Sequence, residues 1–216
     1  MDDLALTPVS ARVLGALVEK QLTTPQQYPL TMNALQAACN QTSSRNPVVT
    51  YEEQLLDTTV ASLKSRGLLR FVHPSHGRSA TRYRQVLEEV LDLDVQELAL
   101  VAVLLLRGPQ TVGELRSRTE RMAEFKDLRE VEDRLEALAS RPDPLAARLP
   151  REPGRKEERW VQLLAADTGA VDTSPPRGEG RPSEAGPSLA MQVVALQAEV
   201  AALRRDLDEL IERLGS

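Results

Sequence analysis

The sequence predicts an α+β protein that is mainly helical and carries small β-hairpins. Only six of its 216 residues are aromatic, so its core must consist of Leu, Val and Ala, which favours packed helices over a β-sandwich. Capping signals mark five helix starts, and an order of helices followed by a hairpin occurs twice. The chain is long enough for one large or two small domains without disulfide or metal cross-links.

The helix starts are marked by polar residues that can cap them. Ser, Thr or Asp followed three residues later by Glu can satisfy two backbone N–H groups reciprocally. Such boxes begin at Thr50, Asp94, Thr111 and Asp127, and Thr7-Pro8 adds a cap followed by proline at the first helical position. We therefore expect helices over residues 8–21, 31–40, 51–66, 95–107, 112–119 and 128–139.

Two pairs of short segments have the pattern of β-hairpins. Residues 68–73 and 81–85 flank a turn that contains Pro, Ser and Gly. Residues 147–149 and 159–163 flank a second turn over residues 151–156. We expect one hairpin after the third helix and one after the sixth.

The two halves of the chain repeat one another. Residues 31–35 align with residues 111–115 at an offset of 80, and the apolar pattern of residues 56–66 aligns with that of residues 131–141 at an offset of 75. Three helices followed by a hairpin is the order of a winged helix-turn-helix. The sequence thus predicts two tandem winged helix-turn-helix domains, at residues 1–90 and 91–166.

The C-terminal part differs from both domains. Eight of the 22 residues at 167–188 are Pro or Gly, which predicts a flexible linker with a reach of roughly 25 Å. Apolar residues then alternate at steps of four and three, which predicts a coiled-coil helix at 189–214 and a homodimer. The seam residues are Leu189, Val193, Leu196, Val200, Leu203, Leu207, Leu210 and Leu214. The same helix could instead fold back onto the second domain.

Composition limits the protein's environment and chemistry. A single cysteine, Cys39, excludes an internal disulfide and suits a reducing compartment. The N-terminal residues lack the pattern of a secretory signal, and the longest apolar run, residues 98–106, is too short to span a bilayer. We expect a cytoplasmic protein that does not enter a membrane.

The residues that could support catalysis or bind a metal are few. A Cys-His nucleophile or metal site would have to use Cys39, His73 and His76. Cys39 lies in an apolar helix and the two histidines flank a turn, so a core position and surface positions explain them more simply. No phosphate-binding loop, nucleophile elbow or HExxH motif is present. We expect no enzyme activity, no metal and no cofactor.

Basic residues gather in the first predicted hairpin and at its root. No Asp or Glu occurs between Asp57 and Glu88, although the net charge of the chain is −5. Basic side chains of this kind bind phosphates and release counterions. The candidate DNA-binding residues are Lys64, Arg66, Arg70, Arg78, Arg82 and Arg84.

Acidic residues on the helices that would enter the DNA groove oppose this interpretation. Glu52, Glu53 and Asp57 begin the third helix, although a capping contact with Thr50 could occupy Glu53. The sixth helix is still more acidic, so we expect that the second domain reads no bases. The apolar stretch at 98–106 predicts a helix covered on all sides, by the other domain or by a second chain.

Five segments of the sequence are distinctive, at residues 19–30, 38–41, 104–111, 113–118 and 151–154. They resemble the YceH-like family of bacterial proteins. The similarity runs from about Leu6 to Leu164 and on into the C-terminal heptads. The resemblance implies a tandem winged-helix fold. It implies no activity, because the family is uncharacterised.

We therefore expect a non-enzymatic protein that binds double-stranded DNA, as a transcription regulator does, through the first hairpin. The alternative is a scaffold whose tandem winged helices bind a protein partner and no DNA. The overall pI of about 5.3 favours the scaffold, whereas the local excess of six positive charges favours DNA.

Overall fold

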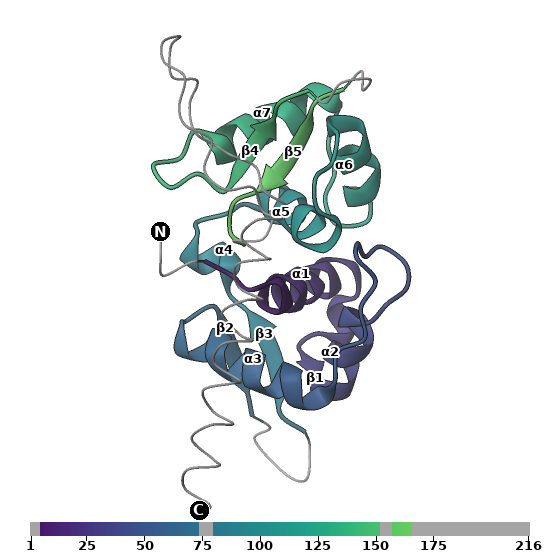
Figure 1. Cartoon of the computed structure of the whole chain (residues 1–216), viewed down its shortest axis with the longest axis vertical. Helices are drawn as coiled ribbons and strands as arrows, with labels where there is room; N and C mark the ends of the chain where they lie inside the picture. The colour runs from purple at the N-terminus through teal and green to yellow at the C-terminus, as the bar shows by residue number, and fades with distance from the viewer. Residues whose placement is uncertain (1–4, 74–79, 152–156, 166–216) are drawn as a thin grey trace, which may run out of the picture. The chain divides into compact units, whose positions relative to one another are not determined.

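The computed structural model describes residues 5–73, 80–151 and 157–165 (Figure 1). These residues form an α+β structure of helices and small antiparallel sheets, as the sequence predicts. The elements are α1 (Pro8–Thr23), the 3-10 helix η2 (Pro25–Gln27), β1 (Leu30–Thr31), α2 (Met32–Cys39), α3 (Glu53–Ser65), β2 (Leu69–Val72), β3 (Arg82–Gln85), α4 (Leu87–Val90), α5 (Val95–Arg107), α6 (Val112–Thr119), α7 (Leu128–Ala139), β4 (Ala146–Leu149) and β5 (Arg159–Gln162).

The first half contains a three-stranded antiparallel sheet in the order β1-β3-β2. Its central residue, Tyr83, pairs with Leu30 on one side and Phe71 on the other. The hairpin of β2 and β3 confirms the prediction, whereas β1 and the short helix α4 were not predicted. Two residues of strand and four of helix are too short to produce a periodic signal in the sequence.

The second half repeats this arrangement with α5, α6, α7 and the β4-β5 hairpin. The backbone of Gln110 exchanges two hydrogen bonds with that of Trp160, N to O at 2.9 and 2.7 Å, in the place that β1 takes in the first half. In both halves the next residue, Thr31 or Thr111, is the N-cap of the second helix. The internal repeat therefore extends to the strand residue before the cap.

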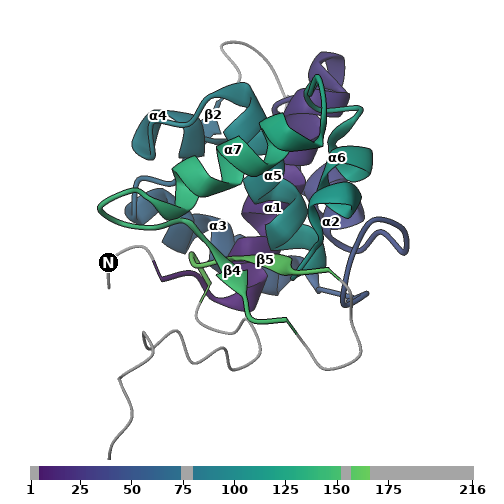
Figure 2. The same ribbon diagram turned by 90° about the horizontal axis from the view of Figure 1, so that it is seen from above.

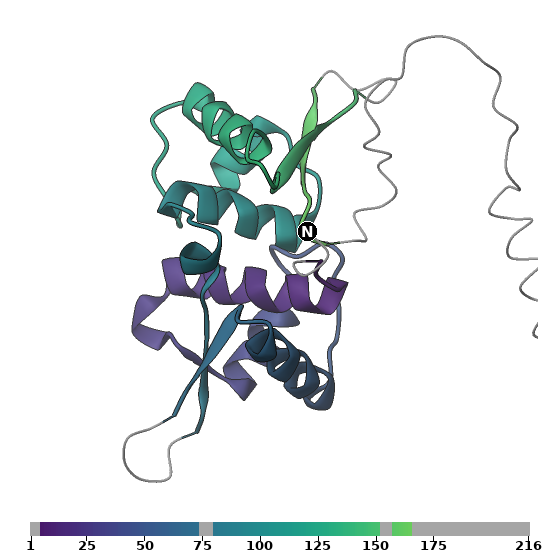
Figure 3. The ribbon, with the colours of Figure 1, turned by 90° about the vertical axis from the view of Figure 1, so that its left-hand side faces the viewer.

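The two halves share one hydrophobic core through α1 and α5. These helices lie side by side in both Figure 2 and Figure 3, and every residue from Leu98 to Leu106 is buried. Gly15 makes the approach close, since a Cβ added there would lie 2.9 Å from Leu106 Cγ. The apolar helix is thus covered by the other half of the same chain, one of the two alternatives that the sequence left open.

Most of the predicted helix caps are present. Thr7 accepts a hydrogen bond from the Ser10 N–H, and Asp94 and Thr111 form complete capping boxes. Asp127 caps α7, but its predicted capping box is incomplete. The Glu130 carboxylate accepts a hydrogen bond from the N–H of Lys126 instead of from the N–H of Asp127.

The predicted capping box at Thr50 is wrong, because α3 begins only at Glu53 and has no side-chain cap. Asn40 holds the Tyr51 backbone extended, with its Oδ1 accepting from Tyr51 N at 2.8 Å and its Nδ2 donating to Tyr51 O at 3.0 Å. Gln36 Nε2 also donates to Tyr51 O, at 3.0 Å. The contact with α2 therefore prevents the helix from starting at Thr50.

The linker at 167–188 and the heptads at 189–214 lie outside the described residues, as do Arg78 and His76. None of the helices within the described segments is long and apolar enough to cross a membrane.

Candidate nucleic-acid interface

The hairpin of β2 and β3 and the end of α3 place the described candidate residues on one part of the first half. Arg82 and Arg84 alternate along β3 with the buried Tyr83 and Gln85, as the two-residue period of a strand requires. Arg70 lies opposite Arg84 on β2, and its side chain is 59% exposed. Lys64 and Arg66 stand at the C-terminal end of α3. Arg70, Arg82 and Arg84 therefore share one face of the sheet, whereas Lys64 lies against Phe71 on the other face.

The unpredicted helix α4 supplies carboxylates to this basic group. Glu89 forms ion pairs with Arg70 at 2.7 Å and with Arg84 at 2.6 Å, and Glu88 lies 3.8 Å from Arg84. These two acids follow the acid-free stretch directly in the sequence. Their pairing with the hairpin depends on the turn of chain into α4, which the sequence analysis did not include.

The other three cations also have partners in the chain. Lys64 Nζ lies 4.4 Å from the centre of the Phe71 ring, Arg66 donates to the backbone oxygen of Ala5 at 3.1 Å, and Arg82 donates to that of Pro29 at 2.8 Å. Exposed contacts of this kind contribute little to stability, so a phosphate can replace them at small cost.

The exposed surface of α3 is divided by charge. One line of residues along α3 points away from the buried side chains of Leu56, Val60 and Leu63. The residues of this outer line are all exposed and uncharged, and they are Gln54, Thr58, Ala61 and Ser65. Glu53 and Asp57 lie to one side of this line on α3. Burial raises the pKa of Tyr83, and the negative charges of Asp57 and Glu53 raise it further. The outermost line of α3 thus presents no carboxylate.

The second hairpin has one arginine that is surrounded by carboxylates, two of them from α7. Arg148 on β4 forms ion pairs with Glu132 at 2.9 Å, with Glu158 at 2.8 Å and with Glu136. Its guanidinium also lies 5.0 Å from the Trp160 ring. Hydrogen bonds that Arg148 donates to Glu158 and Glu136 raise the pKa of Arg148, despite partial desolvation. One cation therefore faces three carboxylates here.

The residues weighed for catalysis or metal binding do not come together in the described structure. Cys39 is fully buried, and burial raises the pKa of its thiol to about 12. His73 is exposed and contacts the Phe71 ring and the Thr81 hydroxyl. Over the residues that the structure describes, no group of three His, Cys, Asp or Glu side chains could hold a metal ion.

Comparison with known proteins identifies the family. A family model described as "Protein of unknown function, DUF480" matches residues 6–155, which is more than half of the chain. The chain belongs to the DUF480 family. It is 45% identical to the UPF0502 protein YceH of Salmonella paratyphi A and 47% identical to a UPF0502 protein of Enterobacter sp. (strain 638). Each match covers 97% of this chain and 98% of the relative, so the resemblance to the YceH-like family is confirmed.

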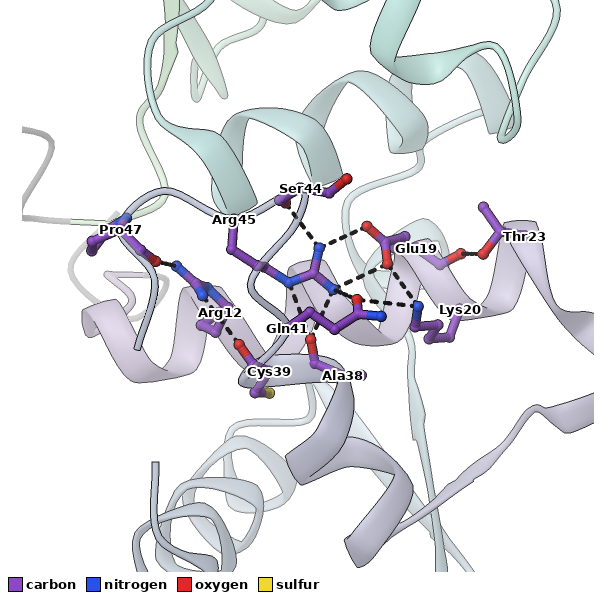
Figure 4. A network of polar contacts seen from close by, with 10 residues as sticks. All are labelled: Arg12, Glu19, Lys20, Thr23, Ala38, Cys39, Gln41, Ser44, Arg45 and Pro47. Carbon is purple, nitrogen blue, oxygen red and sulfur yellow. Dashed lines mark hydrogen bonds and ion pairs between the residues drawn. The ribbon is translucent and has the colours of Figure 1, made fainter. Parts of the chain in front are cut away.

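This DUF480 chain also contains a buried polar network that the sequence analysis did not single out (Figure 4). Arg45, whose side chain has no exposed surface, pairs with Glu19 on α1 at 2.8 and 3.0 Å and donates to the backbone oxygen of Ala38 at 2.8 Å. Gln41 accepts a further hydrogen bond from Arg45, and Arg12 donates to the backbone of Cys39 and Pro47. The network anchors the loop after α2 to α1.

The anchored loop reaches the second half. The N–H of Asn46 donates to the backbone oxygen of Leu106 at 2.9 Å, at the C-terminal end of α5. The sequence carries one signal for this network, because the apolar run at residues 13–18 ends at the charged residue Glu19. Nothing in the sequence identifies Arg45 as the partner of the Glu19 carboxylate. That pairing joins residues 26 positions apart.

Proposed function

We propose that the two repeats are winged-helix modules and that the first binds the backbone of duplex DNA through its hairpin, in the service of regulation rather than catalysis. The observation that carries the proposal is the set of three arginines, Arg70, Arg82 and Arg84, on one face of the first hairpin. A wing that contacts phosphates next to a helix that can enter a groove is the usual geometry of such modules.

The charge balance favours backbone contacts over base reading. Three hairpin arginines face Glu88 and Glu89, whereas on the uncharged outer line of α3 only Gln54 has a side chain that could make a bidentate contact with a base. With three to five phosphates bound, the logarithm of the affinity should fall with the logarithm of salt at a slope of roughly −3 to −5.

The first test removes cations from the hairpin. Replacing Arg82 and Arg84 together by Ala should weaken binding to all duplexes alike and reduce the salt slope by about 2, which fluorescence anisotropy can measure. The matched control replaces Arg116 and Arg121, two exposed arginines of the second half, and should leave the slope unchanged. Equal effects of the two double variants would contradict the proposal.

The second test uses the ion pairs with α4. The change Glu89→Gln keeps the shape of the side chain and releases Arg70 and Arg84, so duplex affinity should rise by about two- to fivefold. Glu120→Gln, an exposed change of equal charge in the second half, should have a smaller effect. A Glu89→Gln variant that binds duplexes no better than Glu120→Gln would argue against a role for the hairpin arginines.

A protein-binding scaffold is the second candidate function. It is favoured by the neutralisation of Arg70 and Arg84 within the chain and by the exposed apolar side chains of Leu55 on α3 and Val72 on β2. Absence of duplex binding at about 50 mM salt, where phosphate contacts are strong, would favour the scaffold. A photo-crosslinking residue at position 55 should then give protein adducts in cells, and one at Glu120 should not.

We propose further that the heptad segment at 189–214 makes the protein a homodimer. An unbroken apolar seam with branched residues at a and Leu at d is typical of a parallel two-stranded coil. Changing Leu196 and Leu203 to Ser in the full chain should convert the dimer to a monomer in light scattering, while circular dichroism retains the helices of the modules. A wild-type chain that is monomeric at high concentration would contradict this proposal.

A further inference from the structure

A polar pocket of 390 Å³ lies where the loop after α2 meets the end of α5, the start of α6 and the β4-β5 hairpin. Asn46 contributes from the loop, Arg107 and Gln110 from the end of α5 and the segment after it, and Arg159 from β5. Glu114 and Arg118 complete the polar lining from α6. The pocket is separate from the hairpin of β2 and β3 and was not predicted from the sequence.

The charges that line this pocket do not balance. Three guanidinium groups face one carboxylate, that of Glu114. Glu114 is also engaged in the cap of α6, where its Oε2 accepts from the Thr111 N–H at 2.9 Å. It forms a 3.3 Å ion pair with Arg118 and lies 3.7 Å from Arg159. The pocket therefore retains an excess of about two positive charges at neutral pH.

Arg107 is the cation without a counterion. In the described part of the chain its guanidinium has no hydrogen bond and no ion pair, although the residue is half-buried. Burial lowers the pKa of Arg107 and the positive charge of Arg118 lowers it further, whereas Glu19 opposes this shift more strongly than Arg45 adds to it. A buried cation beside other cations is unfavourable unless an anion joins it.

One residue that lines the pocket has a buried donor without a partner. Arg159 Nε is buried and forms no hydrogen bond to the described residues, although native structures rarely leave such a donor unsatisfied. The side chains of Gln110 and Arg159 are held in place, since Gln110 Nε2 donates to the oxygens of Arg107 and Pro109 and Arg159 Nη1 donates to that of Pro109 at 2.9 Å. The guanidinium of Arg159 is therefore positioned before any ligand arrives.

We propose that this pocket binds a small molecule that carries a phosphate monoester. Such a group bears close to two negative charges at neutral pH and accepts several hydrogen bonds, which matches the charge excess, whereas a carboxylate would neutralise only half of it. The volume is in the range of small-molecule sites and exceeds that of one phosphate, so the organic part lies against Pro109 and Leu149. The inference does not depend on DNA binding by the first hairpin.

Calorimetric titration of the full chain tests this assignment. The probes are glycerol 3-phosphate and inorganic phosphate, with glycerol and acetate as uncharged and singly charged comparisons. Saturable binding of glycerol 3-phosphate is expected, weaker binding of inorganic phosphate, and still weaker or undetectable binding of acetate and glycerol.

Variants locate the binding. Arg107→Gln and, independently, Arg118→Gln should each weaken the binding of glycerol 3-phosphate by about tenfold or more, as the loss of a charge-assisted hydrogen bond requires. The matched control Arg116→Gln removes a neighbouring arginine of α6 that does not line the pocket and should change the affinity by less than about twofold. Thermal unfolding verifies that each variant is folded, and Arg118→Gln decides the matter if Arg107→Gln does not fold.

Three results would overturn the proposal. The first is no saturable binding of either phosphate probe at about 10 mM, which is weaker than a built site should give. The second is unchanged binding in a folded Arg107→Gln or Arg118→Gln variant. The third is displacement of glycerol 3-phosphate by a short duplex, which would assign these arginines to a nucleic-acid surface instead of a small-molecule pocket.

Discussion

The two halves of the molecule share an order of elements but use arginine–carboxylate pairs in opposite ways. At the first hairpin, the carboxylate of Glu89 forms ion pairs with the two cations Arg70 and Arg84. At the second hairpin, the single cation Arg148 forms ion pairs with the three carboxylates of Glu132, Glu136 and Glu158. Two arginines therefore share one carboxylate at the first hairpin, whereas one arginine is shared by three carboxylates at the second.

This difference teaches that duplicated modules can diverge in their surfaces while keeping their cores. Leu35 and Leu115 are both fully buried at equivalent positions, and Thr31 and Thr111 cap equivalent helices. Burial constrains those residues in both copies, whereas the charge of an exposed hairpin has little effect on stability. The charge of this surface can therefore differ between the copies while the core stays the same.

The largest expected effect is on the free energy of unfolding, which should differ between variants of a buried arginine in the first half and of an exposed arginine in the second half. Arg45→Ala should lower the free energy of unfolding by about 3–5 kcal/mol, because it removes the buried guanidinium that pairs with Glu19 through two hydrogen bonds and leaves that carboxylate with Lys20 alone. Arg148→Ala should cost less than about 1 kcal/mol despite its three partners, because all of them are exposed. Urea unfolding measures both, and similar losses in the two variants would contradict this contrast.

The contact between the halves gives the next effect. Gly15→Ala should destabilise the protein by about 1–3 kcal/mol, since the new methyl group meets Leu105 and Leu106 of α5. Gly113→Ala on α6 is the matched control, because nothing lies within 4 Å of its Cβ position. That change should be neutral or should stabilise by up to about 1 kcal/mol through the helix propensity of Ala. If thermal unfolding finds Gly15→Ala as stable as the wild type, α1 and α5 pack less closely than described.

A smaller effect concerns Cys39, the last residue of α2, which corresponds to Thr119 at the end of α6. Cys39→Ala should cost about 1 kcal/mol by removing a buried side chain and should not alter duplex affinity. Chemical denaturation together with anisotropy measures both quantities. Loss of duplex binding by a folded variant would show that the thiol has more than a packing role.

The smallest effect is a dependence of stability on acid. Burial alone raises the pKa of Glu19, but hydrogen bonds and charge from Arg45 and Lys20 outweigh it, so that the pKa lies below its ordinary value of 4.5. The stabilisation is therefore complete above pH 4.5 and is lost as the pH falls through the folded-state value. Glu19→Gln should flatten the decline of the unfolding temperature in this range relative to Glu120→Gln. An identical decline in both variants would exclude Glu19 as the group that titrates.

Much of the fold could be predicted from the sequence because its signals are local. The caps at Thr7, Asp94 and Thr111 act within one turn of helix, and the two hairpins have alternating side chains around turn residues. The predicted bounds of α6 and α7 match the structure to the residue. The failure at Thr50 has a different origin, since Asn40, ten residues away, determines where α3 begins.

The sequence by itself determined which helix is apolar on all sides, where most helices start and which segment concentrates positive charge, because spacing and composition carry that information. Only the tertiary structure decided which charges remain unpaired. Glu89 turns back onto the first hairpin, Arg45 reaches Glu19 across 26 residues, and Arg107 is left facing other arginines in a pocket. Electrostatic interactions depend on distance in space and on burial, and neither is fixed by separation along the chain.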